Sequence, residues 1–205
     1  MLQDIRKVLY RESTILSRLD ELASEITEDY RGKDVTVVAI LNGSFIFLAD
    51  LLRRIPMHLQ VDCLSVSSYR GTKSTGRVTF RQARLADTRG RHVLILDDIL
   101  DSGVTLHTIR EHLAARSGAL SLKVCVLLRK RVDRSRPVEA DYVGFDIPNE
   151  FVVGYGLDFN ERYRNLPFIG VLTEEAIRRG DLMPAAEETS RIAGRKQGKR
   201  KPTRR

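Results

Sequence analysis

The chain has 205 residues, of which 42% are hydrophobic and 30% are charged. This composition supports a folded core and excludes a wholly disordered chain. No apolar run reaches the ~18 residues that a membrane helix needs, and the first residues lack the apolar stretch of a signal peptide. We therefore expect a cytoplasmic protein with one folded domain.

The net charge of +8 is concentrated at the C-terminus. Residues 191–205 hold eight of the 35 Lys and Arg residues and no acidic residue, so the rest of the chain has 27 basic and 27 acidic residues. We predict a single domain over residues 1–185 and a basic, disordered tail over residues 186–205. A basic tail can also contact nucleic acid or acidic surfaces, which keeps a nucleic-acid-binding function open at this point.

The two cysteines, Cys63 and Cys125, each lie in an apolar, strand-like run. We interpret both as buried free thiols. A disulfide or a metal site is not expected from two isolated cysteines in a cytosolic chain.

The first periodic segment predicts an amphipathic helix of about four to five turns. Its apolar positions recur at helical spacing from Ile15 to Ile26. Ser13 is the predicted N-cap, and Gly32 lies just beyond the predicted end of the helix.

The following segments alternate between strand-like and helical patterns. In chain order we predict a buried strand over residues 35–41, a helix over 45–54, a strand over 59–66, a polar mobile loop over 67–78, a buried strand over 92–97, a helix over 103–116, a strand over 122–128, and short strands over 142–146 and 151–153. Strands separated by helices indicate a parallel sheet with helices on both faces. The polar loop and the segment after Asp141 are interpreted as additions to this α/β domain.

The most informative segment is an apolar strand that ends in acidic residues and leads into a helix. Asp97 and Asp98 are adjacent, Asp101 follows, and Ser102–Thr105 opens the helix. Ligands of parallel sheets bind beyond the carboxyl ends of the strands, and a helix N-terminus offers free N–H groups to a phosphate. Gly103 allows close backbone approach. The turn therefore presents carboxylates for hydroxyl groups and donors for a phosphate, which suits a ribose 5-phosphate.

Simpler interpretations account for less of this segment. Asp97 and Asp98 could merely cap the helix, but capping needs only one such residue, and three crowded carboxylates would repel one another without a ligand or cation. An EF-hand is excluded because its alternating ligands and closing Glu are absent. A Walker A motif is excluded because no Gly-Lys-Ser/Thr is present.

Residues 94–105 resemble the signature of type I phosphoribosyltransferases, which bind 5-phosphoribosyl-1-pyrophosphate. The resemblance extends over about residues 10–175 and is closest to the hypoxanthine-guanine branch. It implies an α/β fold with a central parallel sheet flanked by helices, and a small hood formed partly by the C-terminal segment. It also implies a purine salvage enzyme that transfers 5-phosphoribosyl to N9 of hypoxanthine or guanine, giving IMP or GMP and pyrophosphate.

The resemblance assigns roles around the ribose. Asp97 and Asp98 match the acids that bind the 2′ and 3′ hydroxyls, and Asp101 matches the general base near purine N7. The first acid is often Glu in the family, so Asp97 shortens the reach by one methylene but keeps the charge. The 5′-phosphate loop is assigned to Ser102, Gly103, Val104 and Thr105.

The resemblance also assigns a pyrophosphate site and a flap. Asn42 and Gly43 match the pyrophosphate loop, in which the family has an unusual cis peptide, and Arg164 matches an arginine that reaches pyrophosphate. Asn42 replaces the usual Lys or Arg, which preserves a backbone N–H contact but removes a side-chain charge. Ser68 and Tyr69 match the closing flap, which would exclude water from an oxocarbenium-like ribose centre. The alternative for this segment is an ordinary flexible connection.

The purine site is assigned to residues after the later strands. Lys130 matches the lysine that donates to the exocyclic oxygen at C6, although it could instead belong to a solvated basic cluster with the arginines beside it. Phe151 matches the aromatic residue that stacks on the purine, or it is a core aromatic. Val152 would offer backbone groups to the base edge, and Asp158 matches a carboxylate that contacts the base edge and holds a magnesium ion.

The expected cofactor is Mg²⁺, which would neutralise the leaving pyrophosphate. Asp158 is the expected ligand, and Asp97 and Asp98 are further candidates. The expected partners are phosphoribosyl pyrophosphate, a purine base and a second copy of the chain in a homodimer or homotetramer; no membrane or nucleic-acid partner is expected. Two alternatives remain: a xanthine-preferring enzyme and an RNA-binding, nucleotide-sensing regulator of the same fold.

The assignment of Lys130 predicts which bases are used. A 6-oxo group accepts the lysine proton, whereas the 6-amino group of adenine would place one donor against another and leave buried groups unpaired, at a cost of ~1–3 kcal/mol or more. Adenine should therefore be a poor substrate in steady-state assays. Efficient use of adenine would refute the role of Lys130.

Overall fold

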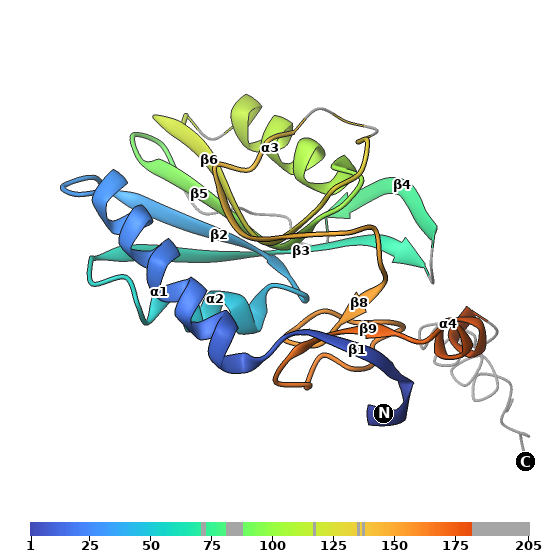
Figure 1. The fold of residues 1–205 in the computed structure, drawn as a ribbon. Helices are drawn as coiled ribbons and strands as arrows, with labels where there is room; N and C mark the ends of the chain where they lie inside the picture. Colours follow the sequence, from blue (N-terminus) through green and yellow to red (C-terminus); the bar gives the residue numbers. More distant parts are fainter. Residues whose placement is uncertain (71–72, 81–87, 117, 135, 137, 182–205) are drawn as a thin grey trace, which may run out of the picture.

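The computed structural model describes residues 1–70, 73–80, 88–116, 118–134, 136 and 138–181 (Figure 1). Its elements are η1 (Leu2–Asp4), β1 (Ile5–Tyr10), α1 (Glu12–Asp29), β2 (Val35–Leu41), α2 (Phe45–Leu52), β3 (Leu59–Arg70), β4 (Lys73–Phe80), β5 (His92–Leu100), α3 (Val104–Arg116), β6 (Ser121–Lys130), β7 (Tyr142–Ile147), β8 (Val152–Val153), β9 (Ile169–Leu172) and α4 (Glu174–Asp181). Within the described ranges, none of the helices combines the length and the apolar composition that a membrane crossing requires. The predicted tail, residues 186–205, lies outside the described residues.

The main sheet has six strands in the order β4-β3-β2-β5-β6-β7. The pairs β2–β3, β2–β5, β5–β6 and β6–β7 are parallel, and only β4 is antiparallel to its neighbour. Figure 1 shows α1 and α2 on one face of the sheet and α3 on the other. The predicted parallel sheet flanked by helices is therefore confirmed.

The apolar strands are explained by burial on both faces. In β2, Val37 and Ala39 belong to the cluster that includes α1 and α2, whereas Val38 and Ile40 belong to the cluster that includes α3. Because successive side chains of a strand point to opposite faces, a strand covered on both sides is apolar at nearly every position. The exception in β2 is Thr36, whose buried hydroxyl accepts a hydrogen bond from Arg91 at 2.8 Å. The β-branched run over residues 35–41 is thus the sequence mark of a central strand.

Helix α1 matches its predicted periodicity but not its predicted cap. Ile15 is fully buried on the side that faces the sheet. The helix begins at Glu12, so Ser13 lies in its first turn, and the preceding Arg11 makes no side-chain cap bond. The prediction of Ser13 as N-cap was wrong; an acidic residue in the first turn favours the same helix end through the helix dipole. Gly32 follows the helix with φ of 70°.

A second sheet with the order β1-β9-β8 forms the hood. It encloses its own small core, which includes Val153 and Phe159. The C-terminal segment supplies β8 and β9, as expected, but β1 from the N-terminus was not predicted. The interpretation of everything after Asp141 as an addition was also wrong, since Tyr142–Ile147 is strand β7 of the main sheet. Strand β7 joins the main sheet by pairing parallel with β6, and the sequence of residues 142–147 does not show which strand they pair with.

The predicted mobile loop over residues 67–78 was wrong in its secondary structure. Strand β3 continues to Arg70 and pairs antiparallel with β4, with Tyr69 opposite Ser74. Strand β4 lies at the edge of the sheet, where polar residues are tolerated in a strand. A polar, Gly-containing composition therefore did not exclude strand structure here.

The buried face of α3 should be essential to stability. Ile109 is fully buried between α3 and the sheet, whereas Leu120 is 64% exposed. Ile109→Ala should lower the free energy of unfolding by about 2–5 kcal/mol, because it removes buried methyl groups and leaves a cavity. Leu120→Ala is the control and should change the urea midpoint little. Equal effects of the two variants would contradict this packing.

Candidate active site

The carboxyl ends of three neighbouring strands bring the predicted site residues to one edge of the main sheet. Strand β2 ends at Leu41 and leads into Asn42, β5 carries Asp97 and Asp98 near its end, and β6 ends at Lys130. The parallel register β2–β5–β6 aligns these ends. The Leu41–Asn42 peptide bond is cis. This edge is the expected place for a ligand of an open parallel sheet.

Two glycines allow the loops at this edge to touch. A Cβ atom on Gly43 would lie 1.7 Å from Oδ2 of Asp98, and a Cβ atom on Gly156 would lie 2.2 Å from the carbonyl oxygen of Gly43. Neither position has space for a side chain. The turn after β2, the acidic end of β5 and the loop after β8 therefore form one contiguous surface.

Of the two adjacent carboxylates at the end of β5, Asp97 is buried and Asp98 is partly buried. Asp97 is 6% exposed, and one of its oxygens accepts the backbone N–H of Asp98 at 3.0 Å. Burial raises the pKa of Asp97 well above its ordinary value, and the Asp98 carboxylate raises it further. Burial also raises the pKa of Asp98, with the Asp158 carboxylate adding to the rise and Arg164 opposing it. Burial thus disfavours the ionised form of both carboxylates in the protein alone.

Lys130 and Asp101 form an ion pair across the site. Nζ of Lys130 lies 2.8 Å from Oδ2 of Asp101, and the two side chains are 11% and 30% exposed. The adjacent Arg129 turns elsewhere and binds Asp146 at 2.6 Å. Lys130 is thus largely buried and paired with an acid. It lines an open pocket of about 280 Å³ together with Arg129, Arg131 and Arg134.

Arg164 and Asp158 lie in the loop between β8 and β9. Nη1 of Arg164 is 2.8 Å from Oδ1 of Asp158 and also donates to the carbonyl of Gly156 at 2.9 Å. The second oxygen of Asp158 accepts the N–H of Glu161 at 2.9 Å. Burial raises the pKa of Asp158, while the Glu161 N–H and Arg164 oppose the rise. The loop holds the predicted pyrophosphate arginine and the predicted magnesium ligand together.

The predicted 5′-phosphate turn leads directly into α3. Gly103 has φ of 79°, and a Cβ atom there would lie 2.8 Å from the carbonyl oxygen of Arg136. Helix α3 begins at Val104, so the amide groups of its first turn lack helical acceptors. Ser102 and Thr105 lie on either side of this helix start and have other contacts within the protein.

The remaining predicted residues lie in the hood, at Phe151 and Val152, and in strand β3, at Ser68 and Tyr69. The ring of Phe151 packs edge to face on Phe159 at 4.9 Å between centroids, and its side chain is half-buried. Val152 is buried and pairs with Val171 in the hood sheet. Ser68 and Tyr69 lie in β3, but their side chains are outside what the structure describes.

The residues of this edge fit a hard cation. In the described part of the chain, no group of three or more His, Cys, Asp or Glu residues is arranged to enclose a metal ion. Asp97, Asp98 and Asp158 nevertheless all have raised pKa values, and burial is the main cause for each. Carboxylate oxygens under such strain suit Mg²⁺, which takes one or two protein carboxylates and fills its other positions with substrate oxygens and water.

One contact at the site was missed at the sequence level. Gly156 brings the hood loop onto the carbonyl of Gly43, and it belongs to a Gly-Tyr-Gly segment in which Gly154, Tyr155 and Gly156 all have positive φ. Two glycines flanking an aromatic residue were the available signal, since positive φ favours glycine.

Comparisons with known proteins agree with this geometry. The chain matches a family described as "Phosphoribosyl transferase domain" over residues 6–160. It is 47% identical over 173 residues to a hypoxanthine-guanine phosphoribosyltransferase of Streptococcus pneumoniae, covering 84% of this chain and 96% of that protein. It is 42% identical over 175 residues to a hypoxanthine-guanine-xanthine phosphoribosyltransferase of Tritrichomonas foetus, covering 85% and 95%. The crystal structure of a hypoxanthine phosphoribosyltransferase from Staphylococcus aureus superposes with a TM-score of 0.80 at 45% identity, covering 86% and 96%.

The burial of Asp97 predicts that the free energy of unfolding of the ligand-free protein depends on pH. The folded pKa of Asp97 is raised above its ordinary 3.8, so its contribution to stability is complete below that value and is lost as the pH rises through the folded pKa. Asp97→Asn keeps an acceptor for the Asp98 N–H and removes this loss. The variant should be more stable than the unmodified chain at pH 7, and the difference should shrink toward pH 4 in urea unfolding. A difference that is constant with pH would contradict the burial of a strained carboxylate.

Proposed function

This chain belongs to the phosphoribosyltransferase family, and we propose that it transfers the 5-phosphoribosyl group from phosphoribosyl pyrophosphate to N9 of hypoxanthine or guanine. The products are IMP or GMP and pyrophosphate, so the enzyme acts in purine salvage. The observation that carries the choice of base is the partly buried pair between Lys130 and Asp101, 2.8 Å apart beside the acidic end of β5. One residue of the pair donates and the other accepts, as the edge of a 6-oxopurine requires.

The ribose phosphate lies between the acidic residues and the start of α3. Asp97 and Asp98 accept hydrogen bonds from the 2′ and 3′ hydroxyls, which replace the water that burial has removed. The amide groups of Gly103, Val104 and Thr105, with Ser102, bind the 5′-phosphate. The absence of a side chain on Gly103 and the helix start at Val104 support this assignment.

The purine enters beside the Lys130–Asp101 pair. The ammonium group of Lys130 turns to the oxygen at C6, and the Asp101 carboxylate accepts the proton near N7 as N9 attacks ribose C1. Phe151 covers one face of the base, and the backbone of Val152 and Asp158 meets its edge. The half-buried ring of Phe151 supports this placement, because part of the ring remains available for stacking.

The pyrophosphate lies at the turn after β2. The amide groups of Asn42 and Gly43 face it, and Arg164 supplies the charge that Asn42 lacks. Bound Mg²⁺ would be held by Asp158, with Asp97 and Asp98 as further candidates, and would neutralise the departing pyrophosphate. The strand pair β3–β4, with Ser68 and Tyr69, would cover the reacting centre and exclude water.

A xanthine-using enzyme is the second candidate. The Tritrichomonas foetus relative, 42% identical, carries xanthine in its name together with hypoxanthine and guanine. The three bases share the 6-oxo group that Lys130 would recognise, so the lysine alone does not separate them. The family resemblance further supports a cytoplasmic location and a homodimer or homotetramer. Light scattering would test the oligomeric state.

The direct test is a spectrophotometric assay with phosphoribosyl pyrophosphate, Mg²⁺ and each purine in turn. We expect turnover with hypoxanthine and guanine, and the rate with xanthine decides between the two candidates. Asp101→Asn should lower kcat by roughly 10²–10⁴, because it removes a proton acceptor, while GMP binding persists. No turnover with any purine would overturn the proposed function, and unchanged turnover in Asp101→Asn would overturn the role of Asp101.

A further inference from the structure

We propose that Tyr155 is a positioning residue for pyrophosphate recognition, which ties the hood loop carrying Arg164 to the helix that follows the pyrophosphate turn. This inference rests on the proposed function. Tyr155 lies beside the assigned site. Its hydrogen bond would keep the hood loop with Arg164 at a fixed distance from the turn that holds Gly43.

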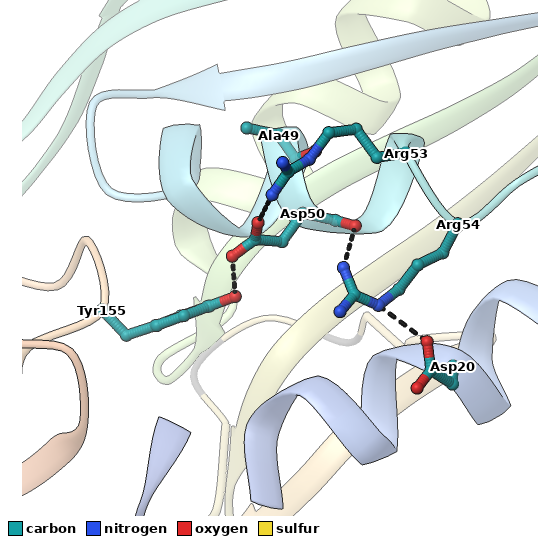
Figure 2. A network of polar contacts seen from close by, with 6 residues as sticks. All are labelled: Asp20, Ala49, Asp50, Arg53, Arg54 and Tyr155. Atoms are coloured by element: carbon teal, nitrogen blue, oxygen red, sulfur yellow. Dashed lines mark hydrogen bonds and ion pairs between the residues drawn. The ribbon is translucent and has the colours of Figure 1, made fainter. Parts of the chain in front are cut away.

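The tie is a hydrogen bond from the phenol of Tyr155 to α2 (Figure 2). The hydroxyl donates to Oδ2 of Asp50 at 2.5 Å, and Tyr155 is 2% exposed. The other oxygen of Asp50 accepts from Arg53, and its backbone carbonyl accepts from Arg54 at 2.8 Å. Arg54 in turn binds Asp20 of α1 at 2.8 Å. The Asp50 carboxylate is thus shared between Tyr155 and Arg53 and its side chain is only 16% exposed, while Arg54 joins the backbone of α2 to α1.

On the α2 side, the tie reaches the pyrophosphate turn through a short, buried path. The hydroxyl of Ser44 donates to the carbonyl of Ile40 at 2.5 Å, and the N–H of Leu48 donates to the carbonyl of Ser44 at 2.7 Å. Ser44 directly follows Gly43 and precedes the first residue of α2. Any shift of α2 would thus move the turn.

On the hood side, Tyr155 belongs to the same bonded loop as Arg164. Its N–H donates to the carbonyl of Leu166 at 2.8 Å, and the N–H of Gly156 donates to the carbonyl of Arg164 at 2.9 Å. The guanidinium of Arg164 returns a bond to the carbonyl of Gly156 at 2.9 Å. Tyr155 has φ of 53°, a conformation that is unfavourable for a bulky residue and needs support from its surroundings.

The tie joins the two segments that carry the proposed pyrophosphate residues, although the tied loop also holds Asp158, which meets the base edge. A Cβ atom on Gly156 would clash with the carbonyl oxygen of Gly43, so the two sides also approach closely at this point. Lys130, at the end of β6, has its own partner in Asp101 and belongs to neither side of the tie. Loss of the phenol hydroxyl should therefore weaken binding of ligands that carry pyrophosphate more strongly than binding of ligands that lack it.

The test compares Tyr155→Phe with a matched control, Tyr142→Phe. Tyr142 is also buried, and its hydroxyl donates to Oδ2 of Asp29 at 2.6 Å. It is the first residue of β7, however, and so lies at the end of that strand away from the carboxyl ends that form the candidate site. Binding of phosphoribosyl pyrophosphate with Mg²⁺ and of GMP is measured by calorimetry. Tyr155→Phe should weaken phosphoribosyl pyrophosphate roughly five- to thirtyfold and GMP less than about threefold, because only part of the free energy of the lost hydrogen bond acts on the pyrophosphate residues. Tyr142→Phe should bind both ligands like the unmodified chain.

A second pair of variants tests the acceptor. Asp50→Asn retains an oxygen for the phenol and should restore most of the affinity that Asp50→Ala loses. Combining Asp50→Ala with Tyr155→Phe should weaken phosphoribosyl pyrophosphate no more than either change alone. Unchanged phosphoribosyl pyrophosphate binding in both Tyr155→Phe and Asp50→Ala, or equal weakening of both ligands, would overturn the positioning role. Failure of the unmodified chain to bind phosphoribosyl pyrophosphate would instead overturn the proposed function.

Discussion

The packing of two adjacent carboxylates into the carboxyl end of a buried parallel strand is the constraint around which this molecule is arranged. Asp97 is 6% exposed, and its neighbour Asp98 lies against a glycine that leaves no space for a side chain. Ionised carboxylates lose hydration at such a place, and the raised pKa values of both residues show the cost. Under the proposed function, the ribose hydroxyls and a divalent cation would relieve that cost, so the same burial would favour substrate binding.

Glycine and the parallel register together make this arrangement achievable. The register of β2, β5 and β6 aligns three strand ends, and the loops that follow them approach within contact distance only because Gly43 and Gly156 lack side chains. The hood then adds Asp158 and Arg164 from a region distant in sequence. The site is therefore a product of long-range packing, although each part of it is a short local motif.

Local pattern was sufficient for the central strands and the acidic turn. The β-branched run over residues 35–41 predicted a buried strand, and the Asp-Asp pair after an apolar strand predicted a ligand-binding turn. Each prediction needed no more than about a dozen consecutive residues. Local pattern was insufficient where pairing decides the structure. Strand β1 forms because it meets β9 more than 150 residues later, with Ile5 opposite Leu172, and the polar β4 is a strand because an edge position tolerates polar residues. The Lys130–Asp101 pair and the Tyr155–Asp50 bond also join residues that no short window contains.

The most direct measurement of the central claim is a crystal structure with GMP bound. The account predicts that the ribose hydroxyls lie on Asp97 and Asp98, that the 5′-phosphate meets the amide groups from Ser102 to Thr105, and that O6 of the base takes Lys130 away from Asp101. A nucleotide bound anywhere else, with the acidic end of β5 left in contact with the protein alone, would contradict it.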